Sequence, residues 1–414
     1  MSAIDWNLSR RNLLASLTGI AALPAEVPAA AAGTIRPFQV NVPEATLQRI
    51  HLKLADARWP DHLESSDWRY GADVTYMKAL VDHWMHRFDW RKIEAGLNRF
   101  PQFLARVEDF DIHFYHVKGN GPHALPIVLT HGWPYSALAF IDTIGPLTDP
   151  TRFGGSPADA FDVVIPSLPG YAFSSKPKGV PIGPPTTARL WNKLMTEVLG
   201  YSKYMAQGGD WGNAVTIQLG RQYPASLLGI HLNAAGSALT IEGDQSPEIR
   251  EWQKSAGDFR TREWDYFNEQ QHKPETVAFA LNDNPLGLAA WMAEKFKGWT
   301  DSGPDLDSTV SKDQVLTSIM IYLVTDTVAS SIWFYRGAAD ERPPVTGRVS
   351  VPTGFASFPK EVPNLNPPRS VLEKAFNLVH YTKMPRGGHF ACLEQPQLFV
   401  NDLRLFRRKL TTPQ

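Results

Sequence analysis

The chain has little cysteine and almost no net charge. Its 414 residues include one cysteine, Cys392, and the formal net charge is -1. A single cysteine excludes an intrachain disulfide and a cysteine-cluster metal site, so Cys392, in an apolar run, is expected to be a small core residue. A nearly neutral chain has no global field that would favour nucleic acid or an anionic membrane as a partner. The sequence also lacks Gly-x-Ser-x-Gly, the pattern of a serine nucleophile.

The remaining composition is that of an ordinary globular protein, with 43% hydrophobic and 20% charged residues. A chain of this length suits one elaborated domain, or one domain with a cap, better than several independent domains. No internal repeat is visible, and no feature of the sequence specifies an oligomeric state.

Residues 1–32 have the features of an export signal. Arg10-Arg11 precede a mildly apolar run to about Ala25, and four alanines follow Pro28. A twin-arginine pair, a short apolar region and an alanine-rich cleavage zone are the parts of a twin-arginine signal peptide. The apolar run is shorter than the roughly 20 residues that span a bilayer. We therefore expect the twin-arginine machinery to export the protein to the periplasm or beyond, with cleavage near Ala31 or Ala32.

An amphipathic or disordered tail is the alternative for residues 1–32, and the protein would then be cytoplasmic. Residues 33–109 are expected to form an N-terminal extension wrapped on the main body. Residues 36–42 alternate like a strand, and helix-like apolar spacing follows at 43–57 and 76–88. This extension carries no obvious chemistry.

From residue 110 onward, short apolar strands alternate with helix-like segments. The expected strands are 110–117, 124–130, 161–166, the run before Asp210, 228–233, 349–351 and 380–384, with a terminal helix at 396–409. This order indicates βαβ units and a mostly parallel, buried sheet. Residues 236–340 break the order with helical patterns rich in Trp and Tyr. We expect them to form a helical cap over the strand ends, inserted between the core segments 110–235 and 341–414.

Asp210 stands at the centre of Gly208-Gly209-Asp210-Trp211-Gly212, between a strand-like run and a helix-like run. Small residues two positions before and two after a reactive side chain are typical of a nucleophile elbow. That turn is so tight that the flanking positions tolerate almost no side chain, and its central residue is strained. The alternative is an ordinary glycine-rich turn in which Asp210 caps the following helix.

Two more reactive side chains follow Asp210 at expected strand ends. They are an acid after the strand at 349–351, for which we choose Glu361, and His389, which follows paired glycines. Nucleophile, acid and histidine is the chain order of an α/β-hydrolase triad, and without Gly-x-Ser-x-Gly a serine esterase of that fold is not expected. A solvated loop carboxylate is the alternative for Glu361, and a core or helix-capping histidine is the alternative for His389.

Several segments resemble, in the same order, those of the α/β-hydrolase-fold epoxide hydrolases of the microsomal type. They are Arg58-Trp59-Pro60, His131-Gly132-Trp133-Pro134, Gly208-Gly209-Asp210-Trp211-Gly212, Glu294-Lys295-Phe296, Val351-Pro352-Thr353-Gly354-Phe355 and Gly387-Gly388-His389-Phe390. The resemblance extends from Ile35 onward and departs at the N-terminus, where microsomal relatives carry a membrane anchor. It implies an α/β-hydrolase fold: a mostly parallel central sheet with helices on both faces, a helical cap and an N-terminal extension.

The same resemblance implies that two cap tyrosines hold the epoxide oxygen. They match Tyr266 and Tyr335, with Tyr322 an alternative to Tyr335. It also places the relay carboxylate on Glu361. Phenols can hydrogen-bond this oxygen and donate a proton as the ring opens. Neither a cofactor nor a metal is implied.

An aspartate carboxylate is already anionic at neutral pH, so it needs no base to attack, and the histidine is left to activate water. Hydrolysis of the resulting ester needs hydrogen-bond donors for the tetrahedral oxyanion, and the backbone amides of Trp133 and Trp211 are placed for this. Pro134 is expected to shape the Trp133 loop, as a cis peptide in one reading, and His131 is expected to bond within that loop.

The sequence therefore predicts an epoxide hydrolase that converts a small-molecule epoxide and water into a vicinal diol. A haloalkane dehalogenase is the nearest enzymatic alternative, because it also uses an aspartate nucleophile and Trp211 could bind halide. An exported, non-catalytic binding protein on the same scaffold is the alternative from another class. An exported enzyme would meet environmental epoxides, for which detoxification is the expected role.

Overall fold

The computed structural model describes residues 34–63, 67–236, 239, 246–342 and 347–411. The expected signal segment, 1–32, lies outside the described residues. In the described part of the chain no single helix has the length and hydropathy of a membrane span, although two helices that meet at a 91° bend, Lys312–Val324 and Val328–Asp340, pass that test when joined.

The described strands form one sheet in the order β1-β2-β3-β5-β4-β6-β7-β8-β9. They are β1 Ile35–Phe38, β2 Gln102–Val107, β3 Phe110–Val117, β4 Leu125–Thr130, β5 Phe161–Pro166, β6 Tyr204–Gly208, β7 Leu227–Leu232, β8 Val349–Ser357 and β9 Phe376–Lys383. The six strands from β5 to β9 in this order pair in parallel, whereas β1, β2 and β3 join antiparallel at one edge. The mostly parallel sheet predicted from the sequence is confirmed.

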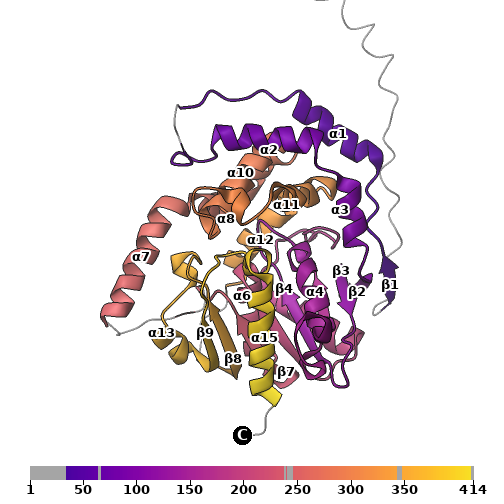
Figure 1. Ribbon diagram of the computed structural model, residues 1–414, viewed down its shortest axis with the longest axis vertical. Coiled ribbons are helices and arrows are strands. Elements are labelled where there is room, and N and C mark those ends of the chain that lie inside the picture. The colour runs from indigo at the N-terminus through magenta and orange to yellow at the C-terminus, as the bar shows by residue number, and fades with distance from the viewer. Residues whose placement is uncertain (1–33, 64–66, 237–238, 240–245, 343–346, 412–414) are drawn as a thin grey trace, which may run out of the picture.

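The described helices surround this sheet. They are α1 Glu44–Ala55, α2 Val74–His86, α3 Trp90–Leu97, α4 Ile141–Thr148, α5 Pro184–Lys193, α6 Asp210–Gln222, α7 Pro247–Glu263, α8 Asp265–His272, α9 Pro274–Leu281, α10 Pro285–Trp299, α11 Lys312–Val324, α12 Val328–Asp340, α13 Arg369–Ala375, α14 Ala391–Glu394 and α15 Pro396–Thr411. Helices α4 and α15 pack against each other on the face turned to the viewer in Figure 1, and α5 packs against α6.

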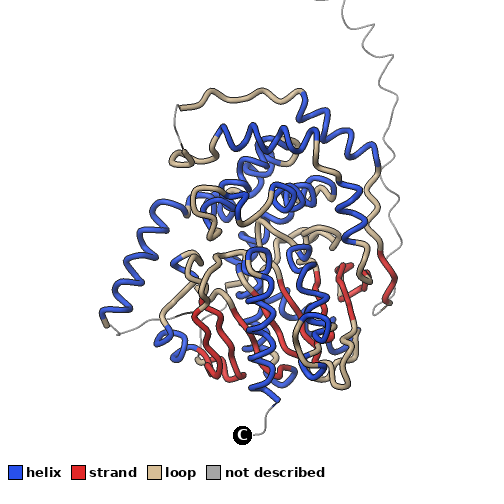
Figure 2. The backbone as a smooth tube through the Cα atoms, in the orientation of Figure 1, coloured by secondary structure: helices blue, strands red, loops and turns tan. Residues whose placement is uncertain are grey.

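Burial explains why the sequences of the central strands are apolar runs. Every residue of β5 is buried, and β6 is buried throughout as well. A strand covered by helices on both faces has no solvent-facing side, so its sequence does not alternate. At the sheet edge β1 alternates between exposed and half-buried residues. Figure 2 shows the strands gathered below a layer made mostly of helices.

Helices α7 to α12 form the cap: α8, α10, α11 and α12 lie above the strands, α7 extends down one side, and the N-terminal extension lies over part of the cap (Figure 1). Helices α1 and α2 contact α10 and α11 of this cap. One of these contacts joins α2 to α11: Nε2 of His83 lies 2.7 Å from Oδ1 of Asp313. The extension therefore covers the outer side of the cap and also supplies β1 and β2 to the sheet.

Three details differ from the sequence expectations. Strand β2 was not expected, because Gln102–Val107 mixes polar and apolar residues without a clear strand signal. Strand β8 runs on past Val351 to Ser357 through Pro352 and Gly354, with an irregular register against β9 where these residues fall. Strand β9 begins at Phe376, four residues earlier than expected, because it pairs along this longer β8.

Candidate active site

Asp210 lies at the sharp turn between β6 and α6. Its φ is 47°, a left-handed conformation that is uncommon for a residue with a side chain. A Cβ added at Gly208 would lie 2.0 Å from the carbonyl oxygen of Gly212, and one added at Gly212 would lie 2.0 Å from that of Thr130. Neither distance is sterically possible, so both glycines are required, as an elbow around Asp210 demands.

Both carboxylate oxygens of Asp210 have defined partners. Oδ1 accepts a hydrogen bond from the backbone amide of Trp133 at 2.9 Å. Oδ2 lies 3.0 Å from Nε2 of His389. A Cβ at Gly132 would lie 2.0 Å from Oδ1, so the loop after β4 reaches this carboxylate because that residue is glycine. One oxygen thus faces a backbone donor and the other faces the histidine.

The structure also brings Glu361 to His389. Its Oε1 lies 2.6 Å from Nδ1 of the imidazole, and both side chains are buried. The contact depends on the backbone, because the amide of Lys360 donates to the carbonyl of Gly387 at 3.1 Å and ties the two loops together. The loops that follow the carboxyl ends of β8 and β9 therefore place Glu361 and His389 side by side.

Burial alone lowers the pKa of His389, because a charged imidazolium loses hydration. The negative charges of Glu361 and Asp210 outweigh this effect and raise its pKa to about 10. At neutral pH the histidine is therefore a cation held between two carboxylates in the free protein. Removal of one of those negative charges lowers its pKa, so that the imidazole can lose its proton and be available as a base at neutral pH.

Tyr266 on α8 and Tyr335 on α12 extend from the cap toward the nucleophile. Their ring centroids are 6.3 Å apart and the two rings are nearly perpendicular. Burial raises the pKa of both phenols well above the ordinary value, and the charge of Asp210 adds to the rise. Both rings contact the indole of Trp133, at centroid distances of 5.7 Å and 6.0 Å.

Tyr322 has a different environment. Its hydroxyl donates to the backbone carbonyl of Tyr135 at 2.8 Å, so this phenol is held within the framework. It is absent from the residues that line the cavity at Asp210, whereas Tyr266 and Tyr335 both line it. Of the two tyrosines considered for the second cap position, Tyr335 is therefore the one that lines the cavity.

The other sequence-predicted residues lie as follows. Trp211 is in the first turn of α6, where backbone amides lack an intrahelical acceptor, so its N–H is free to serve an oxyanion. The Trp133–Pro134 peptide is cis. His131 is buried, its Nδ1 lies 2.9 Å from the carbonyl of Gly132 and its Nε2 accepts from the amide of Leu168 at 3.0 Å. Burial lowers the pKa of His131 to about 4, so it is neutral and structural.

Two residues near the triad were not predicted. Glu394 accepts hydrogen bonds from the amides of Gly388 and Phe390 on either side of His389, at 3.0 Å and 2.9 Å. The carbonyl of Trp299 accepts from the amide of His389 at 2.9 Å. Both contacts fix the loop that carries the histidine. These hydrogen bonds are made with backbone amides, so no side-chain pattern in the sequence marks Glu394 or Trp299.

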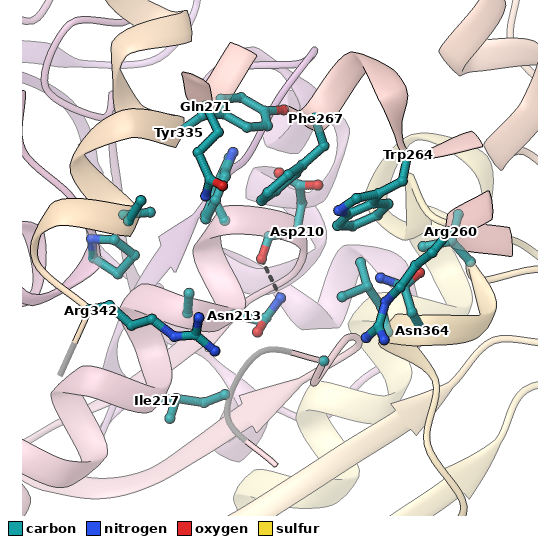
Figure 3. A pocket seen from close by; sticks show the side chains of 18 of the residues that line it. Asp210, Asn213, Ile217, Arg260, Trp264, Phe267, Gln271, Tyr335, Arg342 and Asn364 are labelled. Atoms are coloured by element: carbon teal, nitrogen blue, oxygen red, sulfur yellow. Dashed lines mark hydrogen bonds between the residues drawn. The ribbon is translucent and has the colours of Figure 1, made fainter. Parts of the chain in front are cut away.

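A cavity of about 560 Å³ opens at Asp210 and His389. Near the nucleophile its walls are aromatic, with Phe267, Trp264 and Tyr335 grouped around Asp210 in Figure 3. Farther away, Asn364, Arg260 and Arg342 line it (Figure 3). Aromatic walls near the nucleophile favour an apolar reacting group.

A parallel sheet with a nucleophile elbow, a carboxylate nucleophile in place of serine and a Glu–His pair at the following strand ends define an α/β hydrolase with an aspartate triad. Comparisons with known proteins agree. The family described as epoxide hydrolase N terminus matches residues 35–140, and the alpha/beta hydrolase fold family matches residues 126–274.

Comparison with individual proteins identifies the family of this chain more closely. A protein of Stigmatella aurantiaca, named provisionally as an epoxide hydrolase, is 41% identical over 91% of this chain and 85% of its own length. Epoxide hydrolase 1 of Sus scrofa is 37% identical, covering 92% and 91%. The solved structure of the Aspergillus niger epoxide hydrolase superimposes with a TM-score of 0.81 at 30% identity, covering 91% of this chain and 97% of that one. The chain belongs to the epoxide hydrolase family.

Proposed function

We propose that the protein hydrolyses small-molecule epoxides to vicinal diols through a covalent ester of Asp210. The observation that carries this proposal is the pairing of a histidine-bound carboxylate with two buried phenols across one cavity. A carboxylate nucleophile requires that the leaving oxygen be protonated within the site, and Tyr266 and Tyr335 supply hydroxyl groups there.

In the first half-reaction Oδ2 of Asp210 attacks an epoxide carbon. The carbon–oxygen bond breaks, its electron pair stays on oxygen, and a tyrosine proton moves to that oxygen. Oδ1 then becomes the ester carbonyl oxygen, and it already accepts from the amide of Trp133. The ground-state contact is therefore positioned to become an oxyanion contact without movement.

In the second half-reaction the ester is hydrolysed. Ester formation removes the negative charge of Asp210, so the pKa of His389 falls, and its proton passes to the tyrosinate. Neutral His389 then takes a proton from water, and the hydroxide attacks the ester carbonyl. Glu361 holds the resulting imidazolium through Nδ1. The tetrahedral intermediate then collapses: the bond to the alkyl oxygen breaks, and the leaving alkoxide takes the proton of the added hydroxyl. The diol departs, and Asp210 is again a carboxylate beside protonated His389.

A direct comparison of substrates tests this function. Purified protein is incubated with a simple epoxide and, separately, with a haloalkane of similar size. Diol formation without halide release is expected. Halide release without diol would favour the dehalogenase, and binding of both compounds without turnover would favour a binding protein. Asp210→Asn is the matched inactive control, because Asn tolerates the positive φ at this position.

We also propose that residues 1–32 direct export through the twin-arginine machinery. Arg10-Arg11, the apolar run and the alanine-rich zone support this. Exported enzyme would act on environmental epoxides, and detoxification would be its role. In a bacterial host with this machinery, the protein is expected in the periplasmic fraction or medium in a shortened form. Replacing Arg10 and Arg11 with Lys should retain it, full length, in the cytoplasm. Identical fractionation of both forms would overturn the proposal.

A further inference from the structure

Lys295 is a buried lysine in the cap that the mechanism above does not use. It lies on α10 and is 5% exposed. Its Nζ lies 2.5 Å from Oε2 of the adjacent Glu294 and 4.4 Å from the ring centroid of Tyr266. Lysine is rarely this buried unless its charge is compensated, so a cation at this position indicates a specific partner.

Besides Glu294, the ammonium of Lys295 contacts the aromatic wall behind the active site. The ring centroids of Trp291 and Trp299 are each 6.0 Å from the same ammonium. Trp299 in turn contacts the ring of His389 at 5.0 Å. Lys295 itself does not line the cavity that contains Asp210. It can therefore influence the reaction only through the residues it touches, Tyr266 foremost.

The charges around Tyr266 oppose each other. Asp210 on the cavity side and Glu294 on α10 both raise its pKa, in addition to burial, and so disfavour the phenolate. Glu263 at the end of α7 is close enough to Glu294 and Lys295 for its own pKa to respond to both. The charge of Lys295 opposes the effect of these carboxylates, because its ammonium lies over the face of the Tyr266 ring.

We propose that Lys295 is a positioning residue that stabilises negative charge on Tyr266 while the epoxide opens. This inference rests on the proposed function. When Oδ2 of Asp210 attacks and the epoxide oxygen takes the proton of Tyr266, the tyrosine is left as a phenolate. The ammonium behind its ring favours that anion, so proton donation becomes easier and ester formation becomes faster. Once His389 has returned a proton to this phenolate, the attack of water on the ester involves no charge on Tyr266 and should not depend on Lys295.

Single-turnover kinetics separates these two steps. Enzyme in excess over epoxide is quenched at successive times, and the ester and the diol are measured by mass spectrometry. For K295M we expect ester formation to slow by about tenfold or more, while ester hydrolysis stays within about twofold of the unsubstituted enzyme. K295R keeps the positive charge and should recover most of the lost rate. K297M, on the same helix but bonded to the carbonyls of Gly303 and Pro304, is the matched control and should behave like the unsubstituted enzyme.

E294Q distinguishes electrostatics from anchoring. It removes a negative charge that raises the pKa of Tyr266, so ester formation should be as fast as before or faster, the opposite direction to K295M. Equal slowing of both steps in K295M, no recovery in K295R, or slowing in E294Q would overturn the role assigned to Lys295. Should K295M fail to fold, K295R and E294Q decide the question. Absence of any ester in the unsubstituted enzyme would instead contradict the proposed function.

Discussion

Nε2 of His389 lies 3.0 Å from Oδ2 of Asp210, the same oxygen that attacks in the proposed first step. The histidine thus contacts the nucleophile before reaction and stands beside the ester carbonyl afterwards. With Nδ1 fixed by Glu361 at 2.6 Å, its ring has little freedom to turn away. One imidazole can therefore hold the resting carboxylate and later activate the water that releases it.

Removing the imidazole should stop the cycle at the ester. In His389→Gln the nucleophile and both cap phenols remain, so alkylation proceeds, but no base activates water. Intact-protein mass spectrometry should show a mass increase equal to one substrate molecule. The double variant with Asp210→Asn should show no increase. An unchanged mass in His389→Gln would mean that no ester forms or that another base hydrolyses it.

The pH dependence of the two steps should differ. With Asp210 charged, the pKa of His389 is raised to about 10, although burial lowers it. The ester has lost the negative charge at residue 210, so the pKa of His389 must be lower in the intermediate. Hydrolysis requires the neutral base, so its rate should rise with pH and level off well below pH 10. Single-turnover ester decay measured from about pH 5 to about pH 10 tests this. A rate that begins to rise only near pH 10 would show that the Asp210 charge does not control the histidine.

The two cap phenols should act on ester formation. Loss of a general acid costs on the order of 10²-fold to 10⁴-fold in rate, so Tyr266→Phe and Tyr335→Phe should each slow alkylation, and the double variant should slow it further. Tyr322→Phe is the control. It loses only the bond to the carbonyl of Tyr135, which should cost about 1 kcal/mol of stability and little activity. Equal loss of activity in all three variants would contradict the choice of Tyr335.

Asp402 offers a test of stability that is separate from the chemistry. It is buried on α15, with Nε2 of His231 at 2.9 Å from Oδ2 and Nε2 of His380 at 2.9 Å from Oδ1. Burial alone raises its pKa, but the bonds from both histidines lower it well below the ordinary value. A depressed acid pKa contributes stability above the unfolded value near 3.8, and that contribution is lost as pH falls below it.

Asp402→Asn should therefore lower the free energy of unfolding by about 1–3 kcal/mol at neutral pH, while catalysis is unchanged. The difference from the unsubstituted protein should shrink as pH falls below about 4. Urea unfolding at neutral and acid pH measures both effects. A difference that grows in acid would have the wrong sign for an ionised Asp402.

Local pattern accounts for much of what the sequence predicted. Strands β3 and β5 begin and end at the expected residues because the alternating residues of β3 and the apolar run of β5 are both strand patterns. The elbow at Asp210 was predicted because small residues two positions before and two after a reactive side chain are a local pattern. The pattern itself needs no tertiary information, although the fold adds a second reason for Gly212, whose Cβ would collide with the carbonyl of Thr130.

The features that the local sequence pattern did not determine depend on contacts between residues that are distant in the sequence. The sequence pattern alone did not distinguish Glu361 from other loop acids. In the fold, the hydrogen bond between the backbones of Lys360 and Gly387 places Glu361 against His389. Tyr335 and Tyr322 both lie on apolar cap helices, and only the fold shows which hydroxyl is used by the framework. The contact of Lys295 with the ring of Tyr266 joins α10 to α8 and depends on how the cap helices pack.

The most direct test of the covalent mechanism is a single turnover in water labelled with oxygen-18. Enzyme in excess is mixed with unlabelled epoxide and then digested. The masses of the peptide that contains Asp210 and of the diol are measured by mass spectrometry. Water that attacks the ester carbonyl leaves its oxygen on Asp210, so the peptide should gain one labelled oxygen while the first-formed diol stays unlabelled. Label found in the diol and absent from Asp210 would mean that water opens the epoxide directly and that no ester of Asp210 is formed.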